Sequence, residues 1–236
     1  MSPQFRGPPN SGNGGYVCGL LAEQLPGAIF TGILRAPIPL DVPLRIELLD
    51  GAARLVDAAG GLIAEARAGE AGDLPEAPPA PSLDAATAAG GRFIGLQRTF
   101  HPICFTCATS LEEGYGLRVF VGQVEGAAEG VVAGPWTPHA NFADAEGLAR
   151  FDAVWAALDC PGSVAWVELG GSGGLLGTMT CEITRRPRTG EPCIVLAWPI
   201  ERSGRKSVAG TALYTAQGEL LARSRQIWIG RPASDA

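Results

Sequence analysis

The chain has 236 residues, enough for one large domain or two small ones around a substantial hydrophobic core. Hydrophobic residues make up 46% of it and charged residues 18%, which indicates a folded globular protein rather than a disordered one. The formal net charge of −6 argues against general nucleic-acid binding, because that binding needs a basic surface. The sequence has no apolar run of about 18 residues and no signal-peptide pattern, so we expect no membrane span, a cytoplasmic location and six free thiols.

The first part of the chain predicts one helix followed by strands. Residues 14–25 carry apolar side chains at helical spacing, and Pro26-Gly27 predicts the end of that helix. Pro, Asp-Gly and Gly-Gly signals then separate four expected strands, at about residues 28–36, 44–49, 53–57 and 62–68. A helix and an antiparallel meander are therefore expected within residues 1–72.

Residues 73–92 are rich in Pro, Ala and Gly and predict a linker or a crossover along the surface. The second unit, residues 93–236, predicts a short strand pair within residues 117–133. A second helix is indicated by apolar spacing from Phe151 to Leu158, and Pro161-Gly162 predicts its end. Strands are expected after it at about residues 164–169, 178–185, 193–201, 207–215 and 220–229.

One segment of the chain occurs twice. Residues 57–67 (DAAGGLIAEAR) return as residues 215–225 (TAQGELLARSR), with five identical positions. Each copy predicts a glycine turn followed by an alternating strand, near the end of its unit, which indicates a tandem duplication. The copies then diverge, because the second continues to Gln226 where the first has Ala68.

Three segments resemble the double hotdog acyl-CoA thioesterases, the thioesterase II type in particular. Asn13-Gly-Gly-Tyr16 resembles the His-Gly-Gly opening of many hotdog helices. Ala157-Leu-Asp159 is similar to a Ser-Leu-Asp-His stretch, and residues 212–226 resemble the family's C-terminal strand pair ending in Gln. The resemblance implies an α+β double hotdog fold, with both units packed as one pseudo-dimeric domain. It also implies hydrolysis of an acyl-CoA thioester by activated water, with no cofactor beyond the coenzyme A of the substrate.

The same resemblance implies roles for individual residues. Asp159 would activate or orient the water, Gln226 would help to position it, and Ser203 is the nearest candidate for the family's third group, a hydroxyl. Independently of the family, backbone N–H groups at a helix start can stabilise an oxyanion. The candidates for this role are the residues at the start of the first helix, Asn13, Gly14 and Gly15. A basic cluster suits the phosphates of coenzyme A, and its candidate ligands are Arg186, Arg205 and Lys206.

His101-x2-Cys104-x2-Cys107 contains side chains that suit zinc. A structural zinc site needs four ligands, and the sequence has no second Cys-x2-Cys or His pair. We therefore expect a turn with buried thiols and no metal site.

Two other functions stay open at this level. Cys160 replaces the His that follows the family's Asp, and Asn13 replaces the His of its helix opening, which favours a protein that binds acyl-CoA or another apolar ligand without turnover. An enoyl-CoA hydratase or dehydratase is the third candidate, but its Asp/His pair has no counterpart here. The oligomeric state is also open, with a homodimer of double hotdog chains as one arrangement.

Overall fold

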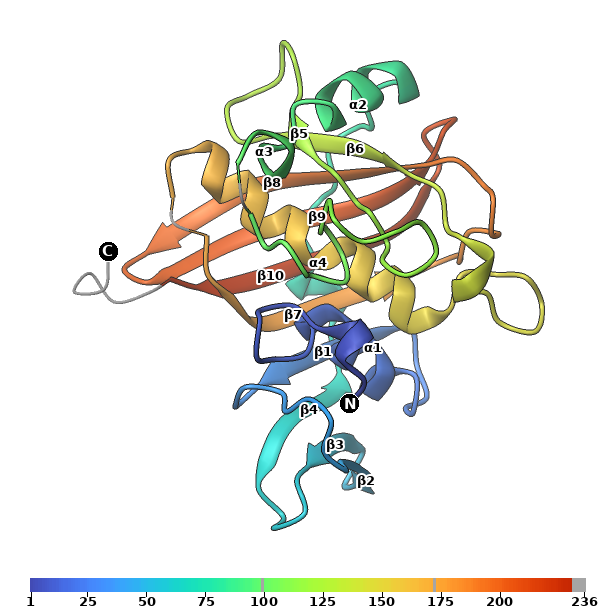
Figure 1. Cartoon of the computed structure of the whole chain (residues 1–236), viewed down its shortest axis with the longest axis vertical. Helices are drawn as coiled ribbons and strands as arrows, with labels where there is room; N and C mark the ends of the chain where they lie inside the picture. The colour runs from blue at the N-terminus through green and yellow to red at the C-terminus, as the bar shows by residue number, and fades with distance from the viewer. Residues whose placement is uncertain (99, 172, 231–236) are drawn as a thin grey trace.

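Ten strands build one continuous antiparallel sheet (Figure 1). The protein is described by a computed structural model that covers residues 1–98, 100–171 and 173–230. The strands are β1 (Ile29–Leu34), β2 (Arg45–Leu49), β3 (Ala52–Val56), β4 (Leu62–Ala68), β5 (Gly122–Gln123), β6 (Val132–Trp136), β7 (Leu175–Ile183), β8 (Cys193–Ser203), β9 (Lys206–Thr215) and β10 (Leu220–Ile229). Their order across the sheet is β2-β3-β4-β1-β7-β10-β9-β8-β6-β5, so β1 and β7 join the two units.

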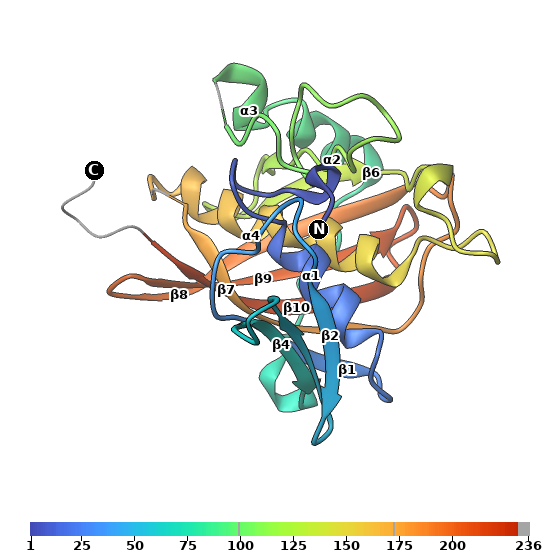
Figure 2. The same cartoon turned by 60° about the horizontal axis from the view of Figure 1, so that its bottom comes forward.

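Two helices lie side by side against one face of this sheet, α1 (Gly14–Ala22) and α4 (Phe151–Glu168) (Figure 2). The helix and meander expected in the first unit are present, although α1 ends at Ala22, before Pro26-Gly27. The short helices are η1 (Pro3–Phe5), η2 (Ala71–Asp73), α2 (Leu83–Gly90), α3 (Ile94–Gln97) and η3 (Ala140–Phe142). Helix α2 lies within the expected linker and packs on β6, which the Ala-rich sequence did not indicate.

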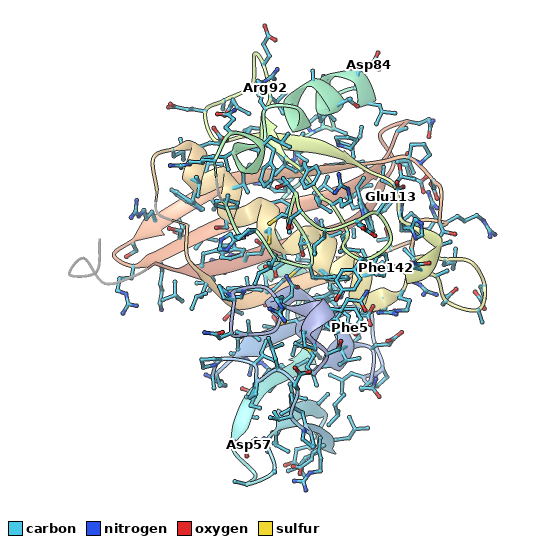
Figure 3. The ribbon with its side chains drawn as sticks, viewed as in Figure 1. Phe5, Asp57, Asp84, Arg92, Glu113 and Phe142 are labelled. Carbon is cyan, nitrogen blue, oxygen red and sulfur yellow. The ribbon has the colours of Figure 1, made fainter. Side chains whose placement is uncertain are left out.

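The duplicated segment has the same structure in both copies. In the first, the amides of Ala59 and Gly61 donate to the Asp57 carboxylate at the tip of the β3–β4 hairpin, where Figure 3 labels Asp57. In the second, the amides of Gln217 and Glu219 donate to the Thr215 hydroxyl in the same way. The two turns therefore occupy equivalent places in the two units.

The junction between the units is symmetric. Thr31 of β1 lies opposite Thr180 of β7, 149 residues away, and their hydroxyls hydrogen-bond at 2.9 Å. Each of these strands pairs on its other side with a copy of the repeat, β1 with β4 and β7 with β10. A local two-fold axis through the Thr31–Thr180 pair therefore relates the units.

An aromatic cluster fixes the N-terminal segment over α1. Phe5 stacks on Tyr16 with ring centroids 4.2 Å apart, and Phe105 packs edge-on against both rings. Phe105 also contacts Phe142, so the cluster ties the segment before α1 to two loops of the second unit (Figure 3).

Helix α4 corrects one expectation. The sequence predicted its end at Pro161-Gly162 and a strand over residues 164–169, but the helix continues through Pro161 to Glu168. The carbonyls of Ala156 and Leu158, just before the proline, accept hydrogen bonds from the Thr106 hydroxyl at 2.8 Å and the Gln226 amide at 2.6 Å. Burial on almost all sides of α4 outweighs the cost of about 3 kcal/mol for an internal proline.

Asp159 is consequently not at the C-terminus of its helix, as the sequence had suggested, but near its middle. Ser172, between α4 and β7, lies outside the described residues. Within the described part of the chain, none of the helices combines the length and the apolar character needed to cross a membrane.

Candidate active site

A cavity of about 530 Å³ opens between the two units, in front of the N-terminus of α1. The first unit contributes the start of α1 and the segment that follows β1, and the second contributes α4, β7 and β10. The wall includes several polar, thiol and aromatic residues, together with a glycine of α1: Asn13, Gly14, Arg35, His101, Cys104, Asp159, Cys160, Ser163 and Trp228. The cavity wall is predominantly apolar, as binding sites for apolar acyl groups need to be.

Asp159 brings its carboxylate to the N-terminus of α1. Its Oδ2 accepts a hydrogen bond from the Gly15 N–H at 3.0 Å, whereas within the described residues its Oδ1 has no partner although it is buried. Burial raises the pKa of Asp159 to about 7, and the bond from Gly15 opposes this rise only in part. A carboxyl group with a pKa near neutrality is suited to accept and return a proton.

Glycine at position 15 is what allows this approach. A Cβ there would lie 2.7 Å from the Cβ of Asp159 and 2.8 Å from the Trp155 carbonyl oxygen, closer than such atoms can come. The neighbouring Gly14 lines the cavity, and its N–H has no hydrogen-bond partner among the described residues. One amide of the helix start therefore faces the cavity and another holds the carboxylate.

The side chain of Asn13 caps the start of α1. Its Oδ1 caps α1 by accepting from the Tyr16 N–H at 2.8 Å, and its Nδ2 donates to the Thr106 hydroxyl at 3.1 Å. The same Nδ2 lies 3.9 Å from the sulfur of Cys104. Hydrogen bonds from the Cys107 and Cys160 thiols hold the pKa of Cys104 well below its ordinary value.

Gln226 is fully buried behind the cavity, not in its wall. Its Nε2 donates to the Leu158 carbonyl, one residue before Asp159, and its Oε1 accepts from the indole N–H of Trp228 at 2.8 Å. Trp228 does line the cavity. Gln226 thus contacts α4 beside Asp159 and the Trp228 side chain of the wall, but does not itself line the cavity.

The structure pairs Ser203 with Lys206 across the β8–β9 hairpin, and not with Asp159 or Gln226. Ser203 is the last residue of β8, exposed at the hairpin that joins β8 to β9, and it does not line the cavity. Two serines do line it: Ser11, whose hydroxyl accepts from the Ile38 N–H at 2.9 Å, and Ser163, one helical turn after Asp159, whose buried hydroxyl has no hydrogen-bond partner in the described chain. The i, i+4 spacing from Asp159 is the signal that could have found Ser163.

The structure does not bring the three basic candidates together at one place. Arg186 forms an ion pair with Asp144 at 2.6 Å and does not line the cavity. Arg205 donates to the Gly230 carbonyl at 3.0 Å, and Lys206 pairs in the sheet with Ile229, which lines the cavity. Arg205 and Lys206 are therefore next to the β10 end of the cavity, whereas Arg186 is not.

Arg35 and His101 also line the cavity, although the sequence had not suggested either of them as a ligand of the substrate. Arg35 follows β1 and is half-exposed, with its guanidinium 2.6 Å from the Glu65 carboxylate. His101 has a φ of 41°, in the left-handed region, at the start of the His-x2-Cys-x2-Cys turn. Only the tertiary structure brings these two residues to one cavity.

Comparison with protein-family models gives no match, and neither does comparison with curated protein sequences. Solved structures do match over the full length. A proposed thioesterase from Novosphingobium aromaticivorans is 15% identical and covers 98% of this chain and 94% of its own, with a TM-score of 0.64. A proposed thioesterase II from Thermobifida fusca is 15% identical and covers 98% and 92%, with a TM-score of 0.59.

A hot dog fold protein of unknown function from Alicyclobacillus acidocaldarius is 13% identical and covers 99% of this chain and 92% of its own, with a TM-score of 0.64. Identities this low carry the fold and not the activity. The helix-and-sheet units, their two-fold junction and these full-length matches together identify the chain as a double hotdog protein of α+β class.

Proposed function

We propose that this protein hydrolyses an acyl-CoA thioester with water that Asp159 activates. The observation that carries the proposal is the carboxylate of Asp159, a residue of the cavity wall whose buried Oδ1 has no partner in the described residues. A base and amide donors at one end of an apolar cavity suit attack on a carbonyl group.

In this reaction Asp159 would act first as a base and then as an acid. The thioester carbonyl oxygen lies against the Gly14 N–H, and water adds to the carbonyl carbon while Asp159 takes the water's proton. The N-terminus of α1 stabilises the resulting oxyanion. The carbon–sulfur bond then breaks, and Asp159 returns the proton to the departing sulfur, which gives a carboxylic acid and the free thiol of coenzyme A.

Gln226 and Ser163 support this chemistry in different ways. Ser163 is in the cavity wall one turn from Asp159, so its hydroxyl can hold the water that is to be activated. Gln226 acts as a positioning residue, because it binds the Leu158 carbonyl and the Trp228 indole on either side of the reacting groups. Ser203 and Arg186 have no part in this proposal, since neither lines the cavity.

Coenzyme A requires contacts for its phosphates outside the acyl pocket. Arg35 and His101 lie in the cavity wall, and Arg205 and Lys206 lie next to its β10 side. Arginine and lysine bind phosphate through paired hydrogen bonds or as a point charge. We propose these residues as the phosphate ligands of the bound substrate.

Thiol release measured across short, medium, long and aromatic acyl-CoAs tests the proposal. Free coenzyme A should appear with at least one of these substrates at a rate that saturates with substrate and exceeds that of an equal concentration of Asp159→Asn. Saturable binding of an acyl-CoA with no thiol release would contradict hydrolysis and support a binding protein. Hydration of an enoyl-CoA without thiol release would instead support the hydratase alternative.

A further inference from the structure

Three cysteine thiols meet at the edge of the cavity. Cys104, Cys107 and Cys160, the thiol cluster, have sulfur atoms that all lie within 4.8 Å of one another, and the sulfurs of Cys104 and Cys160 are 3.4 Å apart. All three residues are buried. The sequence placed two of these thiols together, and α4 supplies the third, from a position 56 residues after Cys104.

The backbone fixes the cluster from both sides. The Cys-x2-Cys turn is closed by the Cys104 N–H donating to the His101 carbonyl and by the Ala108 N–H donating to the Cys104 carbonyl. Thr106, inside the turn, donates its hydroxyl to the Ala156 carbonyl of α4 at 2.8 Å. The turn is therefore tied to the helix that carries Cys160, and the three sulfurs are brought together without a ligand.

The sulfur spacing suits a metal ion better than a disulfide. Three thiolates at zinc–sulfur distances of about 2.3 Å in tetrahedral geometry have their sulfurs about 3.8 Å apart, within the range that the thiol cluster spans. A disulfide would bring two sulfurs to about 2.05 Å and would leave the third thiol without a role. The amide of Asn13, 3.9 Å from the Cys104 sulfur, is placed as a donor to a thiolate ligand.

We propose that Cys104, Cys107 and Cys160 bind one zinc ion as thiolates, with the fourth coordination position facing the cavity. Cys104 and Cys160 line the cavity and Cys107 does not, so an ion held by the three has its open side toward the cavity. Thiolate ligands select zinc and monovalent copper among the common metals. The site shares the cavity with Asp159, but the proposal does not rest on hydrolysis, because its occupancy is measurable whether or not the protein is a thioesterase.

Metal content of the purified full chain tests this site directly. We expect about one equivalent of zinc per chain, and Co²⁺ added after chelator treatment should give the charge-transfer absorption of thiolate ligands. Cys160→Ser and Cys107→Ser should each lose both signals. The control Cys193→Ser removes a buried thiol outside the cluster and should keep them.

Circular dichroism separates loss of the site from loss of the fold. Because Cys107 does not line the cavity, Cys107→Ser provides a second variant if Cys160→Ser does not fold. Reduced parent protein that contains no metal and takes up neither Zn²⁺ nor Co²⁺ would overturn the proposal. Stoichiometric copper in place of zinc would overturn the choice of metal, and metal retained by folded Cys107→Ser would overturn the ligand set.

Discussion

At the scale of single residues, the environment of Asp159 decides its chemistry. A carboxylate that is removed from water and receives only one backbone hydrogen bond is poorly stabilised, which is why burial raises its pKa to about 7. The nearby Asp152 is also buried in α4, but the Arg150 guanidinium binds it through two hydrogen bonds of 3.0 and 3.1 Å. Two buried carboxylates on one helix therefore have different roles.

Asp159→Asn should lower kcat for thiol release by about 10²–10⁴-fold, because the amide keeps the shape of the carboxyl group but cannot accept the proton. KM should change little. Thermal unfolding should occur at the parent temperature or above it, since the variant no longer buries a carboxylate. Steady-state kinetics and circular dichroism measure these effects.

Asp152→Asn is the matched control. It breaks the ion pair with Arg150, so its free energy of unfolding should fall by about 1–3 kcal/mol while kcat stays near that of the parent. Equal kcat values for the Asp159 variant and the parent would contradict the assigned role of Asp159.

Gln226→Ala should destabilise the protein by about 1–3 kcal/mol, because it leaves the buried Leu158 carbonyl and Trp228 indole N–H without their partner. Its kcat should fall less than that of Asp159→Asn, since Gln226 does not itself line the cavity. Chemical denaturation followed by tryptophan fluorescence measures the change, and Gln217→Ala, at an exposed turn, is the control. Unfolding of Gln226→Ala at the parent midpoint would contradict the positioning role.

At the scale of elements, the close approach of α1 and α4 depends on glycine. A Cβ at Gly19 would lie 2.8 Å from the Cα of Asp152 and 2.8 Å from the Cβ of Trp155, and neither atom can move without shifting α4. The two helices thus pack with a glycine of one against the backbone of the other. This contact keeps Asp159 within hydrogen-bond distance of Gly15.

Gly19→Ala should therefore lower the free energy of unfolding by about 1–3 kcal/mol through overpacking. Gly91→Ala, at the end of α2, is the matched control, because its Cβ would meet nothing closer than 3.5 Å and its φ is −63°. That control should be neutral or stabilising by up to about 1 kcal/mol. Denaturant titration of both variants measures the difference, and equal stabilities would contradict the packing argument.

The elements also show where sequence reasoning succeeds. The start of α1 and most strands follow from local signals such as the glycine turns and are present near the predicted positions, whereas the strand predicted over residues 164–169 is part of α4. The continuation of α4 through Pro161 depends on burial of the helix on almost all sides, against elements that are distant in sequence. The thiol cluster was missed for the same reason, because only tertiary packing brings Cys160 to Cys104 and Cys107.

At the scale of the whole molecule, the two-fold axis creates two related positions but not two equivalent sites. Ala68 of β4 occupies the place of Gln226 of β10, since Ala68 pairs with Phe30 of β1 as Gln226 pairs with Met179 of β7. A methyl group cannot replace the hydrogen bonds that Gln226 makes. The family-type site is therefore expected once in each chain.

Calorimetric titration with a non-hydrolysable acyl-CoA analogue should accordingly give about one bound molecule per chain. The same stoichiometry is expected whether the chain is a monomer or a homodimer, because each chain carries its own cavity and Asp159. Light scattering fixes the oligomeric state for that comparison. A ratio near two per chain would mean that the first unit has kept a binding site of its own.

The Thr31–Thr180 pairing has a further consequence during protein synthesis. Strand β1 leaves the ribosome long before β7, and 149 residues separate the two threonines. At about 5–20 residues per second, β1 waits on the order of ten seconds for the strand that covers its edge. An unpaired strand edge invites association with other chains, so the order of translation exposes nascent protein to aggregation at the same seam that later joins its halves.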